Sequence, residues 1–359
     1  MKRIAILSAV VVLVLSFAGM EGRAVALPGD PVPVGDPPTS GDAESALFGV
    51  SSIELRAVET MPAHPLDVLP LRLIDVTVDD AIEKSYARVI APDAPVFNAP
   101  GGSIIRTMGT GFIFVSTGGS QQANGESWTW INGGEWMRTA DLDWRQPSRL
   151  RGVEIDGWPD YEFAWILQPN QPLRTPGGEP NKDAPFLGRY KMVTIYATEW
   201  VNEWRYYMIA PDQWAKESWL GKVRKNPVPE GVSGRWIDID LYEQTLTAYV
   251  DDTMVYATLV ASGLEQWSTN EGVFRVWYKV ADTPMSGSEG QSDYYYLENV
   301  PWNLFFDGES ALHGAYWHDG FGYRRSHGCV NLAPADSLWL YHWADEGTYV
   351  HVHSSHEYR

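Results

Sequence analysis

Short runs that alternate apolar and polar residues begin near residue 86. Residues 87–90, 95–97, 112–115, 128–131 and 135–137 combine β-branched or aromatic side chains with turn residues at their ends. This pattern is typical of short strands, and five of them within about 60 residues predict a small β-barrel. We place this first module at residues 85–147.

Two features of this module are Val96-Phe97-Asn98-Ala99-Pro100-Gly101-Gly102 and the Trp-rich strand that closes it. In these features the module resembles the bacterial Src-homology-type barrel.

The same pattern then recurs in diverged form. Pro100-Gly101-Gly102 returns as Pro176-Gly177-Gly178, 76 positions later, and the run at residues 136–144 is echoed at residues 206–214, 70 positions later. A difference in loop length between two copies of one module explains the change in offset. We therefore predict a second barrel module at residues 155–224, with an unrelated β-module as the alternative.

A third pattern fills residues 231–353. Residues 236–241 alternate as a half-buried strand does, residues 245–250 return as its partner, and residues 255–261 and 272–277 add two more strands. One short helix is expected at residues 333–343, because Pro334 fits a first helical turn. The predicted fold class is thus mainly β.

The N-terminus has the order of a secretory signal. Met1-Lys2-Arg3 precedes an apolar run to Phe17 and the small residues Ala24-Val25-Ala26. The apolar run is shorter than the roughly 20 residues of a membrane-spanning helix. We predict a signal peptide at residues 1–26, cleaved or retained as an anchor, and export to the cell wall or periplasm. Residues 27–80 form a Pro/Gly/Asp-rich tether with an unassigned remainder.

The net charge of −19 argues against a nucleic-acid partner, because a polyanion does not neutralise phosphates. The single cysteine, Cys329, forms no internal disulfide, so it is either a buried inert thiol or a reactive one. No cofactor is expected.

The surroundings of Cys329 favour the reactive thiol. A cysteine attacks as its thiolate, which an imidazole, a positive charge or backbone donors promote. His327 shares a strand face with Cys329 if this segment is extended, and Gly328 permits close approach of a substrate. An intervening loop can fold His313 back against the sulfur.

These residues resemble the signature of the L,D-transpeptidase family, in which His-Gly is followed by a loop and then by Ser-His-Gly-Cys. Here the signature is His313-Gly314 and Ser326-His327-Gly328-Cys329-Val330-Asn331-Leu332. Residues 236–250 resemble the opening hairpin of the family, and Ala261-Ser262-Gly263 resembles its Ser-Gly turn. The usual Thr-Pro-x-Gly step is replaced by residues 268–272. The resemblance implies an L,D-transpeptidase catalytic β-sandwich with a short helix at residues 231–353, preceded by the two small barrels.

The resemblance also implies roles for individual residues. Cys329 is the nucleophile, His313 is the general base oriented by the Gly314 carbonyl, and the backbone of Gly328 and Cys329 stabilises the oxyanion with His327 nearby. Ser326 and Asn331 brace the loop. A further set is expected to line the substrate groove or meet a substrate carboxylate: Tyr295, Tyr296, Trp302, Tyr316, Trp317, Arg324 and Arg325.

The implied reaction is acyl transfer from a tetrapeptide stem of peptidoglycan with release of D-alanine, by a monomer that carbapenem-type β-lactams inhibit. An L,D-carboxypeptidase using the same site, a non-catalytic wall-binding protein and an ordinary cysteine peptidase are the alternatives. No metal is expected. His351 and His353 alternate on a strand, and His356 lies in what resembles a tail. His318 has no assigned role.

Overall fold

The computed structural model describes residues 69–159 and 161–355, so the predicted signal peptide and most of the tether lie outside the described residues. Within the described part, no helix has both the length and the apolar character that a membrane span requires. The protein is mainly β, as predicted. The longest helix among the described residues, α4 (Pro334–Trp343), lies within the predicted range 333–343.

The first group of strands follows a short helix, α3 (Val78–Ala81), capped by Thr77. The strands pair in the order β8–β2–β5–β6–β7–β3–β4. Their bounds are β2 (Ser85–Val89), β3 (Pro95–Phe97), β4 (Ile104–Thr107), β5 (Phe112–Ala123), β6 (Glu126–Ile131), β7 (Glu135–Arg138) and β8 (Leu142–Trp144), with 3-10 turns at Asn132–Gly134 and Thr139–Asp141. Closure of this group into a barrel stays a prediction.

The second group forms two three-stranded sheets, β11–β10–β15 and β12–β13–β14. Their bounds are β10 (Glu162–Ile166), β11 (Met192–Ile195), β12 (Ala197–Val201), β13 (Trp204–Ala210), β14 (Gln213–Lys216) and β15 (Leu220–Lys222), with a 3-10 turn at Glu217–Trp219. The two Pro-Gly-Gly turns have the same geometry, since Gly101 and Gly177 both have φ of +68°.

The structure corrects the alignment of the two groups. Both contain a four-residue strand, a 3-10 turn and a three-residue strand in succession, β7 to β8 in the first and β14 to β15 in the second. These elements lie 78 positions apart, so Trp136 corresponds to Trp214 and the offset of 70 is wrong. The sequence comparison matched aromatic residues, and aromatic residues are too frequent in both groups to fix a register.

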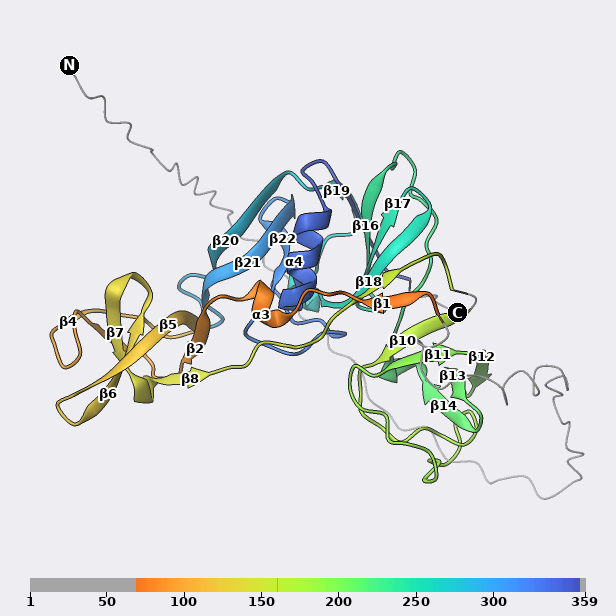
Figure 1. Ribbon diagram of the computed structural model, residues 1–359, viewed down its shortest axis with the longest axis horizontal. Coiled ribbons are helices and arrows are strands. Elements are labelled where there is room, and N and C mark those ends of the chain that lie inside the picture. The colour runs from red at the N-terminus through yellow and green to blue at the C-terminus, as the bar shows by residue number, and fades with distance from the viewer. Residues whose placement is uncertain (1–68, 160, 356–359) are drawn as a thin grey trace, which may run out of the picture. The chain divides into compact units, whose positions relative to one another are not determined.

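The strands within residues 235–353 form two sheets that share the strand β18. One sheet runs β19–β24–β16–β17–β18, and the other runs β20–β21–β22–β23–β18. The bounds are β16 (Arg235–Asp240), β17 (Thr245–Val250), β18 (Thr253–Ala261), β19 (Gly272–Arg275), β20 (Tyr278–Gly287), β21 (Tyr295–Asp307), β22 (Ser310–Gly314), β23 (Val330–Leu332) and β24 (Tyr349–His353). Helix α4 packs beside β21 and β22 (Figure 1).

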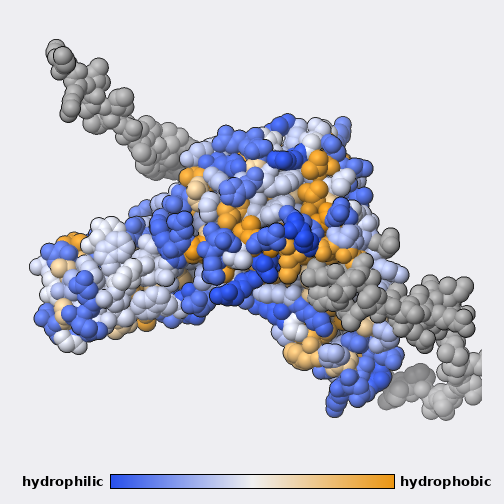
Figure 2. Space-filling model, in the orientation of Figure 1, coloured by the Kyte–Doolittle hydropathy of each residue, from blue (hydrophilic) through white to orange (hydrophobic). Residues whose placement is uncertain are grey.

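The core of this part of the chain lies between its two sheets. Ile237, Ile239 and Leu246 from one sheet meet Leu312 and Val330 from the other, and all five are fully buried. On the face drawn in Figure 2, hydrophobic residues occur in short patches among hydrophilic ones. The apolar halves of the alternating strands therefore face inward, as their patterns predicted.

Two strands from outside the predicted third domain extend its first sheet. β9 (Val153–Ile155) pairs with β18, and β1 (Leu71–Leu73) pairs with β9. Both strands have only three residues, which is too short for an alternating pattern to be recognised. Residues 71–73, which the sequence left unassigned, therefore lie in the same sheet as β16, β17 and β18.

Candidate active site

The site forms where β22 and β23 run side by side. The two strands are parallel, with Leu312 opposite Val330 and His313 opposite Asn331. Cys329 directly precedes β23, and the backbone N–H of Ala311 on β22 donates to its sulfur. His313 and Cys329 are 16 positions apart in the chain, and the pairing of β22 with β23 places them on neighbouring segments of the sheet.

Both residues line one pocket of about 310 Å³. Its walls come from five separate parts of the chain: Phe112, Met285, Asp293, Tyr295, Leu297, His313, Trp317, His318, Arg325, Ser326, His327, Cys329 and Asn331. The sequence singled out His313, His327 and Cys329 through the motif that resembles the L,D-transpeptidase signature, and all three line this pocket.

His313 is held as a neutral base. Its ring is 2% exposed, and Nδ1 lies 3.3 Å from the carbonyl oxygen of Gly314. When Nδ1–H donates to that carbonyl, the lone pair is on Nε2. Burial lowers the pKa of His313 to about 4, so the ring is neutral at physiological pH.

Cys329 rests as a thiol. Its side chain is half-buried, and burial raises the pKa of the thiol above its ordinary value, opposed by the Ala311 N–H and reinforced by Glu309. Since the imidazole is neutral as well, the resting pair carries no charge. In a neutral pair of this kind, attack by the sulfur requires transfer of the thiol proton to the imidazole.

A tight turn presents the sulfur. Gly328 has φ of +116°, a conformation that favours glycine. The hydroxyl of Ser326 accepts from the N–H of Gly328 at 3.2 Å and donates to the carbonyl of Cys329. Ser326 braces the loop as expected. The N–H of Gly328 is occupied in this turn, so its expected oxyanion role requires this bond to open.

The turn at residues 261–263 anchors the cysteine loop. The N–H of Arg325 donates to Ser262 O at 2.8 Å, and the N–H of Leu264 donates to Ser326 O at 2.9 Å. Thr269 Oγ1 accepts from Gly263 N and donates to Gly328 O. Thr269, in the segment that departs from the family pattern, thus fixes Gly328.

His327 lies at the rim of the pocket. Its ring stacks on Trp267 with centroids 3.9 Å apart, and Nε2 lies 3.6 Å from Asp293 Oδ2. The sequence missed Trp267 and Asp293 because neither lies near the cysteine in the chain.

The half-buried His318 and the buried Asn331 form a pair in the same pocket as His313. The N–H of Gly320 donates to His318 Nδ1, so the ring proton is on Nε2, which lies 3.0 Å from the amide of Asn331. The amide must turn its oxygen to this proton, because the opposite orientation sets two donors together and leaves the buried oxygen without a partner in the described chain. The NH₂ group then remains as a donor. Burial, followed by the charge of Arg325, lowers the pKa of His318 to about 3.

Three residues of the expected groove line the pocket: Tyr295, Trp317 and Arg325. Burial raises the pKa of Tyr295 to about 12, and Cys329 adds to this effect only once its thiol has ionised, so the Tyr295 hydroxyl stays protonated. The guanidinium of Arg325 is the cation among the lining side chains.

The other four expected groove residues lie elsewhere, which corrects the prediction. Tyr296 packs against the core of the first strand group, and Tyr316 is buried against Tyr86 with ring centroids 3.6 Å apart. The indole of Trp302 donates to Ala81 O, and Arg324 donates to Gly263 O and Leu241 O. The neighbours that hold these side chains come from distant parts of the chain.

Residues 234–352 match the family model of the L,D-transpeptidase catalytic domain, YkuD. No curated protein matches the chain. Among solved structures, the chain is similar to the Ldtfm–avibactam carbamoyl enzyme (29% identity, 35% of this chain and 51% of that chain, TM-score 0.32). It is also similar to a Cys-to-Ser mutant of the Enterococcus faecium L,D-transpeptidase (28% identity, 34% of this chain and 50% of that chain, TM-score 0.32).

A third similar structure is the L,D-transpeptidase of Stackebrandtia nassauensis (27% identity, 35% of this chain and 58% of that chain, TM-score 0.29). The chain spans about half the length of the first two structures. The family match begins at the strand β16 and ends in β24, and it contains the whole His313 and Cys329 motif. Residues 234–352 are an L,D-transpeptidase catalytic domain of the YkuD type.

Proposed function

We propose that this protein is a peptidoglycan L,D-transpeptidase with Cys329 as its nucleophile and His313 as its general base. One observation carries the proposal: His313 and Cys329 come from neighbouring strands, line one pocket, and the Gly314 carbonyl orients the imidazole. A base held in one tautomer beside a nucleophile is the arrangement that acyl transfer requires.

The first half-reaction forms a thioester. The sulfur of Cys329 attacks the carbonyl that follows the L-centre of the diamino acid at position three of a tetrapeptide stem, and His313 Nε2 takes the thiol proton. The tetrahedral intermediate collapses with cleavage of the peptide bond. D-alanine leaves with the proton from His313, which returns to its neutral form.

The second half-reaction decides the product. When the side-chain amine of a neighbouring stem attacks the thioester, the product is a three-to-three cross-link. When water attacks, the product is a tripeptide stem, and the protein acts as an L,D-carboxypeptidase. Both outcomes use the same Cys329 and His313, and we favour transfer on the family resemblance.

The pocket provides hydrogen-bond donors for the negatively charged transition state and a cation for a carboxylate of the substrate. The NH₂ group of Asn331 and the backbone N–H of Cys329 are donors near the carbonyl oxygen as it becomes negative. Arg325 is placed to meet a carboxylate of the stem. Its counterpart Arg324 is committed to backbone carbonyls, which favours Arg325 for this role.

Carbapenem-type β-lactams are the expected inhibitors, because they present a strained carbonyl to the same thiol. A carbamoylated enzyme is among the similar structures, which supports reaction of such a cysteine with a cyclic acylating agent. The site of action follows from the substrate, since peptidoglycan lies outside the cytoplasmic membrane.

Mass spectrometry of muropeptides tests this proposal. We expect the protein to convert purified disaccharide-tetrapeptides to cross-linked dimers, with tripeptides as the hydrolytic product. Cys329→Ala should abolish both products, and His342→Gln, on the exposed end of α4, should retain them. Products that persist with Cys329→Ala, or cleavage of ordinary proteins, would overturn the proposal. No reaction with either protein would favour the wall-binding alternative.

A further inference from the structure

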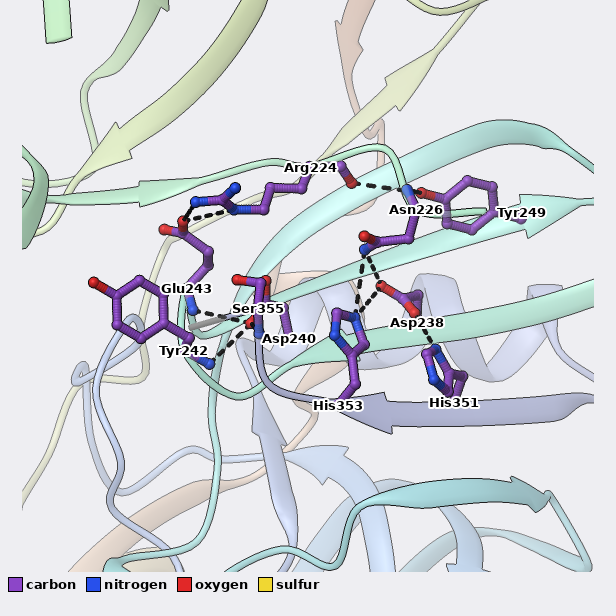
Figure 3. A network of polar contacts seen from close by, with 10 residues as sticks. All are labelled: Arg224, Asn226, Asp238, Asp240, Tyr242, Glu243, Tyr249, His351, His353 and Ser355. Atoms are coloured by element: carbon purple, nitrogen blue, oxygen red, sulfur yellow. Dashed lines mark hydrogen bonds and ion pairs between the residues drawn. The ribbon is translucent and has the colours of Figure 1, made fainter. Parts of the chain in front are cut away.

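A second polar cluster lies on the outer face of the first sheet of the YkuD domain. Asp238 of β16 accepts from two histidines of β24: His351 Nδ1 is 2.6 Å from Oδ1, and His353 Nε2 is 3.0 Å from Oδ2. The three ligand-type atoms lie within 4.8 Å of one another. Figure 3 shows both imidazoles turned toward this one carboxylate.

Strand register creates the cluster. β16 and β24 are parallel neighbours, with Asp238 opposite His351 and Asp240 opposite His353. The intervening Ile237, Ile239, Val350 and Val352 are buried in the core, so the polar residues share the other face. His351 and His353, two positions apart, therefore project the same way over Asp238, and their rings stack with centroids 4.7 Å apart.

The cluster carries a surplus of negative charge. Asp238 and Asp240 are each 2% exposed, and Asp240 Oδ2 has no hydrogen-bond partner in the described part of the chain. A buried carboxylate is costly unless it is paired, so this position favours a positively charged partner.

We propose that Asp238, His351 and His353 bind one divalent transition-metal ion of the zinc class. Two imidazole nitrogens and one carboxylate are ligands that zinc prefers, whereas magnesium and calcium prefer oxygen ligands. Three protein ligands leave a fourth position for water.

The geometry fits with small movements. Ligand atoms around a tetrahedral zinc ion lie about 3.3 Å apart when each bond is about 2.0–2.1 Å. The two Asp238 to histidine distances, 2.6 Å to Oδ1 and 3.0 Å to Oδ2, must open by about 0.7 and 0.3 Å to reach this spacing. The histidines are about one-fifth exposed, which leaves them accessible to an ion from solution.

The expected role of this ion is structural. Asn226, in the segment before the YkuD domain, donates to Asp238 Oδ2 at 2.7 Å (Figure 3). The ion would thus join the last strand, β24, to β16 and to this segment. None of the three ligands lines the pocket of Cys329, so the inference stands apart from the proposed acyl transfer.

Calorimetric titration with Zn²⁺ tests the site on the full chain carrying Cys329→Ala, which removes the competing thiol. We expect one ion per chain and a rise in the melting temperature on binding. Asp238→Asn and His353→Gln should each weaken binding at least tenfold, since both remove a ligand but keep the size of the side chain. His342→Gln, an exposed histidine outside the cluster, should bind as the parent does.

A Co²⁺ spectrum of the chain with Cys329 intact gives an independent readout. Visible bands without a thiolate charge-transfer band are expected, and Asp238→Asn should remove them. A thiolate band would show that the ion binds at Cys329 instead. That result, or Zn²⁺ affinity unchanged by Asp238→Asn and His353→Gln in folded protein, would overturn the inference, as would the absence of binding.

Discussion

At the scale of single residues, the site depends on how burial distributes protons between Cys329 and His313. Burial raises the pKa of the thiol and lowers that of the imidazole, and both effects favour neutral groups. In the proposed mechanism, the reactive form is therefore the neutral pair, which transfers its proton only during attack.

This state predicts the pH dependence of acylation. The pKa of His313 is about 4, so the base is neutral above that pH and is lost as pH falls through it. The rate of Cys329 acylation by a carbapenem, followed by intact-protein mass spectrometry, should be flat from about pH 5 to pH 8 and fall near pH 4. A tenfold rise per pH unit across this range would mean that free thiolate reacts without His313.

The Asn331 amide provides a second prediction. Asn331→Asp keeps an acceptor for His318 Nε2–H but adds a negative charge where the oxyanion develops. Acylation should slow by about 10- to 100-fold, with little change in melting temperature. Asn202→Asp, in an exposed turn, adds the same charge elsewhere and should leave the rate unchanged. An unaltered rate with Asn331→Asp would remove this amide from the site.

His313 and Cys329 could be singled out from the sequence because both lie in a short motif that resembles the L,D-transpeptidase signature, and the structure brings both to one pocket. The positions of Tyr316 and Trp302 away from the pocket could not be predicted, because aromatic side chains occur both in cores and in substrate grooves. Their surroundings, Tyr86 and Ala81, lie more than 200 positions away in the chain.

At the scale of elements, alternation located β16 to β18 and Pro334 located α4. The long strand β21 escaped prediction because it is irregular: it contains Pro301, and Asn299 and Trp302 have positive φ. Proline and bulges interrupt the period of two on which strand prediction depends. Strands β1 and β9 are too short to show any period.

The turn before β23 gives an element-scale prediction. Gly328→Ala places a side chain at φ of +116°, which should lower the free energy of unfolding by about 1–3 kcal/mol and displace the sulfur. Urea denaturation and the acylation rate measure the two effects. Gly188→Ala, where the added carbon meets no atom within 4 Å, is the matched control. Wild-type stability and rate in Gly328→Ala would contradict this account of the turn.

At the scale of the whole molecule, the predicted domains share secondary structure. β5 of the first strand group pairs with β21, with Phe112 opposite Tyr295, and both residues line the pocket of Cys329. β1 and β9 extend the first sheet of the YkuD domain. Sequence patterns report on local period, so they could not show that strands from separate segments complete one sheet and one site. The domain boundaries themselves stay predictions.

Asp336 connects helix α4 to two other parts of the chain, Gly152 and Thr258 of β18. It is fully buried and accepts from Gly152 N at 2.7 Å and from Thr258 Oγ1 at 2.5 Å, and burial raises its pKa to about 6. A carboxyl whose pKa is raised on folding stabilises most at low pH, and this stability is lost as pH rises through about 6.

Asp336→Asn should therefore gain stability relative to the parent between pH 5 and pH 8, by about 1–3 kcal/mol, because the amide keeps an acceptor without the charge. Urea denaturation at the two pH values measures this difference. Asp336→Ala, which leaves Gly152 N without an acceptor, should be destabilised at both. If the difference in free energy of unfolding between the parent and Asp336→Asn were the same at pH 5 and pH 8, the proposed raised pKa of Asp336 would be contradicted.

The central claim is that Cys329 carries the acyl group while His313 serves as its base. It is tested most directly by mixing the protein with disaccharide-tetrapeptide, quenching in acid, and mapping the digested peptides by tandem mass spectrometry. We predict a tripeptide acyl adduct on Cys329 that forms in the parent and is strongly reduced in His313→Ala. An adduct on another residue, or full turnover with Cys329 unmodified, would contradict the account.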